Sequence, residues 1–335
     1  EKYTMAAFGT EFTTQMVSSH YRDRQWSELA VVPVGPLSLH PATHVLHYAS
    51  ECFEGLKAYR TESGSIHLFR PNRHVERMIN SAAQLLLPVP GELTLERSLH
   101  MAVAAVKDEI PAYPGALYLR PTLFGTEEDI GAAARPTQQA IYYVLTSPVG
   151  DYFAGGLKPL SVKVDDQAMR STPGFGAVKT GGNYAAAMRQ VVKAREELGA
   201  DQVLFAPGGD VQETGAANFI LIEDGELLTK PLDGSILPGV TRDCILTLAA
   251  DAGLTITERN FTVQELLERA PRGEAALTGT AAVLTPVGAL LYNGDSHQVG
   301  NGQMGPWSTR LREQLCAIQS GVAEDPHGWR APLEA

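Results

Sequence analysis

Apolar side chains recur at helical spacing in several stretches of the chain. The first stretch begins after Asn72, which we expect to cap a helix, and its apolar positions recur every three or four residues until Pro88 ends the pattern. The same spacing predicts further helices at residues 93–110, 183–198, 240–252, 263–269 and 306–318. Helices are therefore expected in both halves of the sequence.

Shorter runs of apolar and β-branched residues lie between these helices. They predict strands at residues 66–71, 116–124, 138–147, 160–166, 202–206, 210–213 and 218–223. An uncharged stretch at 275–293 has about the length of a membrane span but contains threonines, glycines and a proline, so we interpret it as buried strand and loop. Because strands and helices do not alternate strictly, the pattern favours an α+β fold.

The length of 335 residues is sufficient for two domains. The segment at 149–159 has no periodicity, little charge and the adjacent glycines Gly155 and Gly156, as expected of a connection between domains. We therefore expect one domain at residues 1–148 and a second at residues 160–335.

The charge balance narrows the range of functions. Acidic residues exceed basic ones and give a formal net charge of −11, which argues against a general binding surface for nucleic acid or an anionic membrane. Any anion must therefore be bound by a few placed groups. The three cysteines are widely separated and the N-terminal residues lack the zoning of a signal peptide, so we expect a reducing, cytoplasmic location.

A glycine-rich loop at 173–182 contains Lys179 and is the first candidate for chemistry. It resembles a nucleotide P-loop only in part, because that motif requires glycine directly before the lysine and Val178 stands there. Two interpretations of Lys179 remain open at this point. It is either an ordinary solvated lysine or an amine that a confined loop desolvates until it is nucleophilic.

Other segments offer groups that bind anions. At the predicted helix start near Val240, free backbone amides and the hydroxyl of Thr241 could bind an anion, although the segment can equally be a plain helix start. Thr280 lies in a second loop with exposed amides, and Arg77 lies on the first predicted helix.

The sequence gives no positive sign of a metal site or of hydrolase chemistry. His40, His44 and His47 are close in sequence, but Pro41 and the alternation after it predict an extended strand, on which positions 44 and 47 point to opposite faces. We therefore expect no metal. The GxSxG motif of hydrolases is absent from the sequence.

Seven segments, in the same order, resemble the branched-chain aminotransferases. They are FEGLKAYR at 53–60, LFRPNRHVERM at 68–78, LYLRP at 117–121, KTGGNY at 179–184, QETGAANF at 212–219, LPGVTR at 237–242 and TGTAAV at 278–283. That family consists of fold-type IV enzymes, like D-amino-acid aminotransferase in fold, that use pyridoxal 5′-phosphate (PLP). The resemblance implies a small α/β domain, an interdomain loop and a larger pseudo-barrel domain that binds PLP.

The resemblance assigns a role to each cofactor-binding position. Lys179 would bond to the PLP aldehyde and move the proton between substrate and cofactor, while Glu213 would pair with the pyridine nitrogen. Tyr184 would lie at the cofactor O3′. The groups implied at the phosphate are Arg77, Val240, Thr241 and Thr280.

The resemblance also implies a substrate pocket with apolar walls and two carboxylate sites. Arg120 would bind the distal carboxylate of glutamate. The remaining contacts implied are Phe53, Tyr118 and Tyr152 at the hydrophobic side chain, Tyr48 and Ala281 at the α-carboxylate, and Ile130 and Ala132 in a loop that reaches the partner's site. A homodimer is therefore implied, and the other partners would be small-molecule substrates.

These roles imply reversible amino transfer from L-leucine, L-isoleucine or L-valine to 2-oxoglutarate, giving branched-chain 2-oxo acids and L-glutamate. Two alternatives remain. Another fold-type IV enzyme, a D-amino-acid aminotransferase or an aminodeoxychorismate lyase, would share Lys179 and Glu213 but not the full motifs at 53–60 and 117–121. The alternative from a different class is a non-catalytic protein that only binds PLP.

Overall fold

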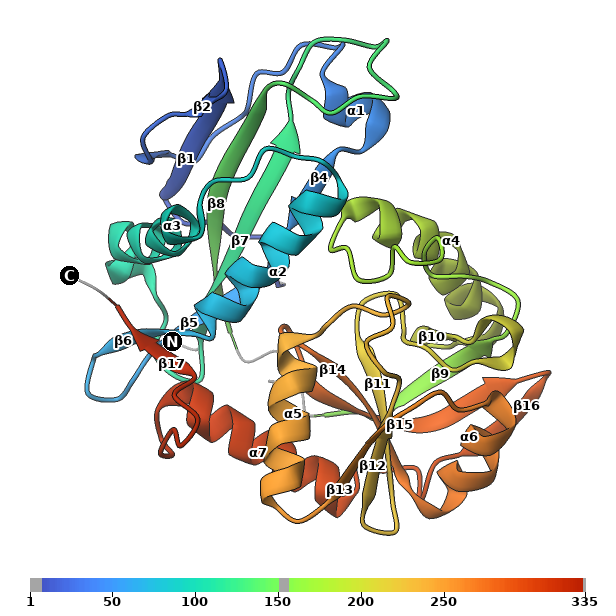
Figure 1. Cartoon of the computed structure of the whole chain (residues 1–335). Coiled ribbons are helices and arrows are strands. Elements are labelled where there is room, and N and C mark those ends of the chain that lie inside the picture. The colour runs from blue at the N-terminus through green and yellow to red at the C-terminus, as the bar shows by residue number, and fades with distance from the viewer. Residues whose placement is uncertain (1–7, 151–156, 334–335) are drawn as a thin grey trace. The chain divides into compact units, whose positions relative to one another are not determined.

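The computed structural model describes residues 8–150 and 157–333, and the chain forms two compact units (Figure 1). Unit 1 comprises residues 1–154, 178–181 and 318–335, and unit 2 comprises residues 155–177 and 182–317. The short segment around Lys179 thus belongs to unit 1, although its sequence neighbours on both sides belong to unit 2. Each unit has its own sheet and its own helices, which confirms the expected α+β class.

Within the described residues, unit 1 contains a sheet of nine strands. The strands are β1 (Gln15–Arg22), β2 (Gln25–Trp26), β3 (Ala30–Pro33), β4 (Glu51–Phe53), β5 (Leu56–Arg60), β6 (Ile66–Phe69), β7 (Ala116–Gly125), β8 (Ala140–Val149) and β17 (Arg330–Pro332). Their order is β17-β6-β5-β7-β8-β1-β2, with β3 paired to β1 and β4 paired to β7. All of these pairs are antiparallel.

Three α-helices accompany this sheet in the described part of unit 1. They are α1 (His44–Tyr48), α2 (Pro71–Gln84) and α3 (Glu92–Ala105). Helices α2 and α3 pack against each other and lie against the sheet, where α3 contacts β1, β7 and β8 (Figure 1). Because their apolar residues recur at helical spacing, one face of each helix joins the core, as Met78 and Leu99 do.

Unit 2 contains a mixed sheet of eight strands in the described residues. They are β9 (Leu160–Asp165), β10 (Gln202–Phe205), β11 (Asn218–Glu223), β12 (Glu226–Thr229), β13 (Thr255–Glu258), β14 (Glu274–Gly279), β15 (Val283–Tyr292) and β16 (Asp295–Gln298). The order is β10-β9-β15-β14-β11-β12-β13, with β16 paired to β15. The strands fan out from a common centre near β15 in Figure 1.

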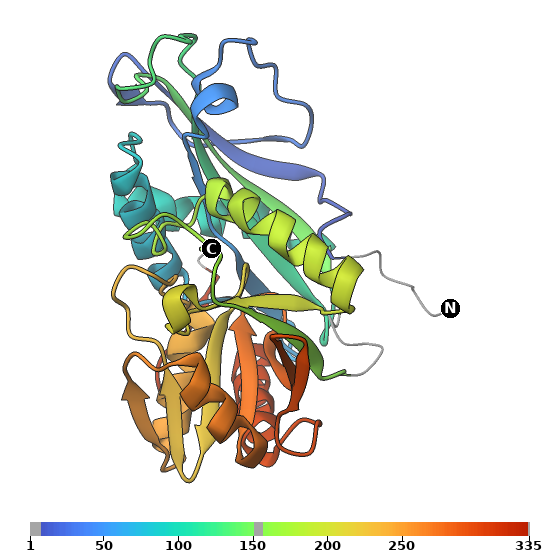
Figure 2. The same ribbon diagram turned by 90° about the vertical axis from the view of Figure 1, so that its right-hand side faces the viewer.

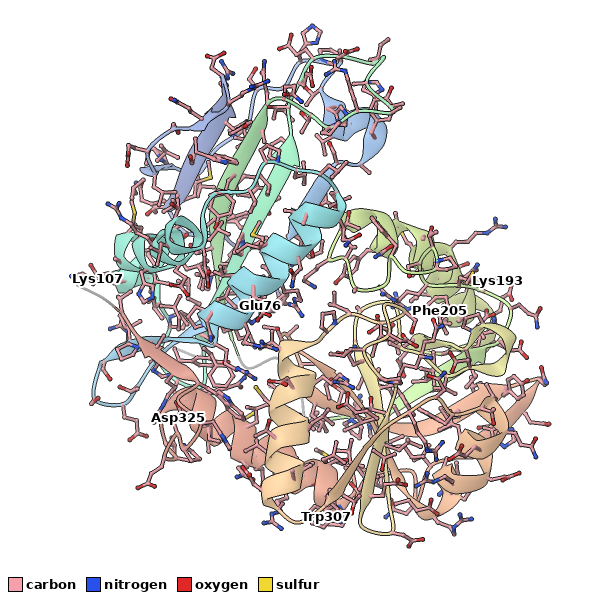
Figure 3. All side chains as sticks on the ribbon, viewed as in Figure 1. Glu76, Lys107, Lys193, Phe205, Trp307 and Asp325 are labelled. Atoms are coloured by element: carbon pink, nitrogen blue, oxygen red, sulfur yellow. The ribbon has the colours of Figure 1, made fainter. Side chains whose placement is uncertain are left out.

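The helices of unit 2 lie against this sheet. They are α4 (Gly181–Leu198), α5 (Val240–Asp251), α6 (Val263–Arg269) and α7 (Pro306–Ser320), of which α4 begins and α7 ends with residues of unit 1. Figure 2 shows α4 as one long helix. It packs through Ala187 and Ala194 on Val203 and Phe205, so small side chains set a close approach. Phe205 is fully buried, and Lys193 on α4 extends outward (Figure 3).

Most of the predicted helices and strands are present with shifted ends, but the predicted cap of the first helix is wrong. Arg70 takes the cap position of α2, with φ 51°, and Pro71 follows at the first helical position. Proline suits that position because its missing N–H would have no helical partner there. The helix predicted at 93–110 also ends early, and a tighter 3-10 turn follows at Lys107–Glu109.

Two predicted strands are wrong. The histidine segment forms the single-turn helix α1, which ends at Ala49 in the left-handed conformation with φ 49°. Residues 210–213 make only isolated bridges. The physical reason is the preceding turn, in which Gly208 and Gly209 both have positive φ and divert the chain from regular pairing.

The uncharged stretch at 275–293 lies mainly in β14 and β15, as predicted. Among the helices of the described residues, none combines the length and the apolar content that crossing a bilayer requires.

A first prediction concerns the core beneath α3. Leu95 is fully buried and Leu93 is 80% exposed on the same helix. We expect Leu95→Ala to lower the free energy of unfolding by about 2 to 5 kcal/mol, because it leaves a cavity in the core. The matched control Leu93→Ala should change it by no more than about 0.5 kcal/mol. Urea denaturation followed by circular dichroism measures both, and equal effects would contradict the placement of Leu95.

Candidate active site

Lys179 lies in a segment of unit 1 that is fixed to strand β4 and helix α2. The Phe53 amide donates to the Lys179 carbonyl at 3.1 Å, and the Lys179 amide donates to Oγ of Ser81 at 3.0 Å. The Lys179 Nζ lies 4.9 Å from the centroid of the Phe53 ring. The backbone therefore holds this half-buried lysine against an aromatic face, as the interpretation of a confined amine requires.

Arg77 is buried and has a carboxylate partner within unit 1. Its Nε donates to Oε1 of Glu54 at 2.7 Å and its Nη2 donates to Oε2 at 2.8 Å. The Nδ1 of His74 lies 2.7 Å from Oε2 of Glu54. Such a two-point contact fixes the plane of the guanidinium group as well as its position.

The charges of this cluster follow from its surroundings. Burial alone would raise the pKa of Glu54, but the charge of Arg77, its hydrogen bonds and those of His74 outweigh burial and hold that pKa well below its usual range. Burial lowers the pKa of His74, and the Arg77 charge lowers it further against the opposing effect of Glu54. Glu54 is therefore an ion and His74 a neutral donor at neutral pH.

Unit 1 contains a pocket of about 520 Å³ that brings together three residues singled out from the sequence. Phe53 reaches it from β4, and Tyr118 and Arg120 reach it from β7. Residues two apart on a strand face the same side, so the alternation in LYLRP places Tyr118 and Arg120 together. Glu51 lines the same pocket and precedes Phe53 by two residues on β4.

Arg120 is surrounded by aromatic groups. Its Nη2 donates to the Tyr118 hydroxyl at 2.8 Å, and its Cζ lies 4.6 Å from the centroid of the Phe53 ring. Within the described residues Arg120 makes no ion pair, and its buried Nε has no hydrogen-bond partner. A Cβ on Gly55 would lie only 2.1 Å from the Tyr118 hydroxyl, so the glycine of FEGL is needed for this packing.

Helix α1 anchors the loop that carries Ile130 and Ala132. The Tyr48 hydroxyl donates to the Ile130 carbonyl, and the His44 ring lies 2.8 Å from Oγ of Ser50 and 3.3 Å from the Ala132 carbonyl. Ala132 is buried, whereas the Ile130 side chain is 65% exposed. The loop is thus held by its backbone and presents Ile130 outward.

In unit 2, Glu213 is buried and both of its carboxylate oxygens accept hydrogen bonds. Oε1 lies 2.8 Å from Nη2 of Arg170 and accepts from the Leu237 amide at 2.9 Å. Oε2 accepts from Nδ2 of Asn218 at 2.6 Å. Arg170 also donates to the Gly176 carbonyl at 2.6 Å. The carboxylate is therefore fixed in one orientation and paired with a buried cation.

Val240 and Thr241 begin helix α5, and Gly239 is its cap residue. A Cβ on Gly239 would lie 2.0 Å from Oδ1 of Asn218, so only glycine fits there. The Asn218 Nδ2 also donates to the Leu237 carbonyl at 2.9 Å. The same asparagine therefore positions Glu213 and the start of a helix whose first amides can bind an anion.

Thr280 and Ala281 lie in the tight turn between β14 and β15, where Gly279 pairs with Val283. Val283 has φ 61°, which is unusual for a β-branched side chain. The hydroxyl of Thr278, just before the turn, is buried without a hydrogen-bond partner. Backbone strain and an unsatisfied polar atom together are typical of a functional turn.

The remaining sequence candidates are placed as follows. Tyr184 lies in the first turn of α4, half-buried, and Tyr152 lies outside the described residues. The described residues contain no group of three or more side chains suited to a metal ion. The His47 ring instead lies 2.8 Å from the Pro41 carbonyl.

Sequence reasoning missed several residues that position the site. The two-residue spacing of Glu51 and Phe53 would have placed Glu51 in the pocket, had residues 51–53 been recognised as a strand. The spacing of His74 and Arg77 on one helix was also visible. The pairing of Arg170 with Glu213 carries no signal in sequence spacing, because a long chain segment separates them.

Comparisons with known proteins agree with this arrangement. Residues 51–290 match the family model described as amino-transferase class IV. A branched-chain-amino-acid aminotransferase of Mycobacterium tuberculosis is 41% identical, covering 97% of this chain and 92% of the relative. The chain belongs to the class IV aminotransferase family.

Solved structures of branched-chain aminotransferases are also similar. The enzyme of Thermoproteus uzoniensis with norvaline has a TM-score of 0.77 and 26% identity, and covers 96% of this chain and 100% of its own. A second enzyme, whose source is abbreviated T.th., was solved with pyridoxamine 5′-phosphate and has a TM-score of 0.78 and 26% identity, covering 95% and 99%. That second enzyme was also solved with N-(5′-phosphopyridoxyl)-L-glutamate and with 4-methylvaleric acid. The fold is that of class IV aminotransferases, as predicted.

A second prediction concerns the Glu54 ion pair. We expect Glu54→Gln to lower the free energy of unfolding by about 3 to 5 kcal/mol at neutral pH, because Arg77 keeps a buried charge without its counter-ion. Glu76→Gln is the matched control, since Glu76 lies on the surface of α2 and pairs only with Arg73 (Figure 3). That control should change stability by no more than about 0.5 kcal/mol.

The pH dependence of the same pair has a definite sign. The folded-state pKa of Glu54 is below its ordinary value of 4.5, so the stability it contributes is present above that pH and is lost as the pH falls below it. The difference between wild type and Glu54→Gln should therefore shrink in acid. Urea denaturation at a series of pH values measures this, and a difference that grows in acid would contradict the assignment.

Proposed function

We propose that this chain is a PLP-dependent branched-chain-amino-acid aminotransferase. It transfers the amino group of L-leucine, L-isoleucine or L-valine reversibly to 2-oxoglutarate. The observation that carries the proposal is the arrangement in unit 1, where Lys179 lies against Phe53 and the adjoining pocket combines aromatic walls with Arg120. The names of the full-length relatives point to the same activity.

The residues present fit the cofactor. A lysine amine suits an aldehyde, and a buried carboxylate with fixed orientation, Glu213, suits a protonated ring nitrogen. Arg77, the helix start at Val240 and Thr241, and the turn with Thr280 supply donors of the kind that bind phosphate. These groups solve the problem of binding a phosphate in a protein of net charge −11.

The chemistry divides between the cofactor and the chain. When bound, PLP supplies an aldehyde that can exchange amines and a ring that withdraws electrons. Lys179 binds the aldehyde carbon and, once displaced, its amine moves a proton from the substrate Cα. Glu213, paired with Arg170, holds a proton at the ring nitrogen. We propose that Tyr184 donates to the phenolic oxygen of the cofactor.

The pocket of unit 1 explains how two different side chains can be accepted. Phe53 and Tyr118 provide apolar faces for a branched side chain, and Tyr152 is proposed to join them. Arg120 provides donors for the distal carboxylate of glutamate or 2-oxoglutarate. We place the α-carboxylate at Ala281 and at Tyr48, whose hydroxyl bonds to the Ile130 carbonyl in this structure.

The alternative of another fold-type IV enzyme makes different demands on substrate. An aromatic pocket with one arginine suits L-leucine and L-glutamate, and it is this pocket that favours the branched-chain assignment. Conversion of D-alanine in preference to L-leucine would indicate a D-amino-acid aminotransferase. Release of pyruvate from aminodeoxychorismate would indicate the lyase.

A homodimer and a cytoplasmic location are part of the same proposal. The anchored loop presents Ile130 outward, as a residue that reaches a second copy of the chain would be. The three cysteines are all free, which suits a reducing compartment. Light scattering on the purified protein tests the dimer.

A third prediction tests the catalytic lysine. We expect Lys179→Ala to abolish transfer from L-leucine to 2-oxoglutarate and to remove the visible absorption band that PLP gains on bonding to a lysine. Lys193→Ala, which removes an exposed lysine of α4, should keep both. Absorption spectra with and without L-leucine measure the effect, and full turnover by Lys179→Ala would sink the proposal.

A fourth prediction tests the role of Arg120. We expect Arg120→Gln to raise the KM for 2-oxoglutarate at least roughly 30-fold, because loss of a desolvated charge pair costs about 2 kcal/mol or more. Reaction of the bound cofactor with L-leucine, which has no distal carboxylate, should change much less. Single-turnover measurements with each substrate separate the two effects, and equal losses for both would contradict this role.

A further inference from the structure

The pocket of unit 1 presents an electrostatic problem that Arg120 alone does not solve. When 2-oxoglutarate is bound, its distal carboxylate compensates the guanidinium charge. When leucine is bound, an apolar side chain covers the same arginine and excludes water from it. A buried charge without a counter-ion is unfavourable, so a second group must compensate Arg120 in the leucine-bound state.

Glu51 is the carboxylate placed to do so. It lines the same pocket as Arg120, and its side chain is half-buried on the face of β4 that also carries Phe53. The Gly181 amide and, at 3.5 Å, the Thr180 hydroxyl donate to its Oε1. A Cβ on Gly181 would lie only 2.4 Å from that oxygen, so the glycine permits this contact.

We propose that Glu51 is the charge-balancing residue of this pocket. It is a carboxylate beside Arg120 when the pocket holds an apolar side chain, and it takes up one proton from solvent when Arg120 binds the distal carboxylate of a dicarboxylic substrate. The inference rests on the proposed function and adds to it a residue that lets one pocket accept both substrates.

The charges around Glu51 determine the direction of this response. Burial raises its pKa, while hydrogen bonds from Gly181 and Thr180 and the charges of Arg120 and Lys179 oppose that rise. A bound distal carboxylate neutralises Arg120 and adds a negative charge nearby, and both changes favour the protonated acid. The other titratable groups lining the pocket are the phenols of Tyr118 and Tyr143.

The test uses the PLP-loaded enzyme and two ligands that cannot react because they have no amino or oxo group. Glutarate carries a distal carboxylate, and 4-methylvaleric acid ends in an apolar branch, while each has one carboxylate for the common site. Isothermal titration calorimetry in buffers of different ionisation enthalpy counts the protons taken up. We expect uptake approaching one proton for glutarate and none for 4-methylvaleric acid.

The affinities should show the same difference. Between the Glu51 pKa of the free and of the glutarate-bound enzyme, the Kd of glutarate should rise about tenfold per pH unit. The Kd of 4-methylvaleric acid should stay nearly constant over that range. Because these measurements use the wild-type protein, they do not depend on how a variant folds.

Glu51→Gln supplies the matched variant, because its amide oxygen can still accept from the Gly181 amide but does not titrate. We expect it to lose the proton uptake and the pH dependence for glutarate, and to bind glutarate more tightly than wild type at alkaline pH. Glu62→Gln, which changes an exposed glutamate of unit 1, should behave as wild type.

Two outcomes would overturn the inference: glutarate binding without proton uptake, or equal weakening of both ligands by Glu51→Gln, which would indicate a purely structural residue. Turnover of L-leucine with 2-oxoglutarate by the same preparation keeps the question separate from the function itself. If that turnover is absent, the proposed function fails; if it is present without proton uptake, only the inference about Glu51 fails.

Discussion

The attachment of the Lys179 segment to strand β4 is the constraint on which the rest of the arrangement depends. The chain leaves unit 2 after residue 177, contributes residues 178–181 to unit 1, and returns to unit 2. In unit 1, the Phe53 amide bonds to the Lys179 carbonyl, Glu51 accepts from the Gly181 amide and Ser81 accepts from the Lys179 amide. A flexible lysine side chain thus starts from a fixed backbone, which limits the volume its amine can reach and reduces the entropy lost in reaction.

The charged residues of both units follow one physical rule, which is that each buried group is oriented by a partner of opposite charge. Glu54 holds Arg77 at two points in unit 1, and Arg170 holds Glu213 in unit 2. Buried ion pairs contribute little to stability beyond what an apolar replacement would give, so they are poor evidence of a structural purpose. Their value here is orientation, because an acidic protein with few cations must aim each of them.

The sequence predicted the elements better than the positions of individual side chains. Strong periodicity gave α2, α5, α6 and α7 with ends in error by a few residues, and the motif alternation gave the pairing of Tyr118 with Arg120 in one pocket. The failures have local causes. The histidine segment forms a helix of one turn, which is too short for any periodic pattern to reveal, and Gly208 and Gly209 interrupt a run that otherwise has the composition of a strand.

The partners of the site residues were beyond sequence reasoning for a different reason. Glu54 and Arg77 meet because β4 and α2 pack together, and Arg170 meets Glu213 because a loop returns to the sheet. Such contacts depend on tertiary packing, which spacing along the chain does not encode. The resemblance supplied the residues expected to touch cofactor and substrate but not those that hold them in place.

The aromatic setting of Arg120 gives a physical reason why one pocket can serve two unlike side chains. The Phe53 and Tyr118 rings lie 4.6 and 5.3 Å from the guanidinium carbon, so their faces stabilise its charge while presenting apolar surface to a ligand. An arginine in an aliphatic wall would lack that attraction, and a lysine would carry a more strongly hydrated point charge. The stacked guanidinium therefore remains compatible with a branched hydrocarbon chain and keeps donors for a carboxylate, and this combination is what amino transfer between a hydrophobic and an acidic substrate requires.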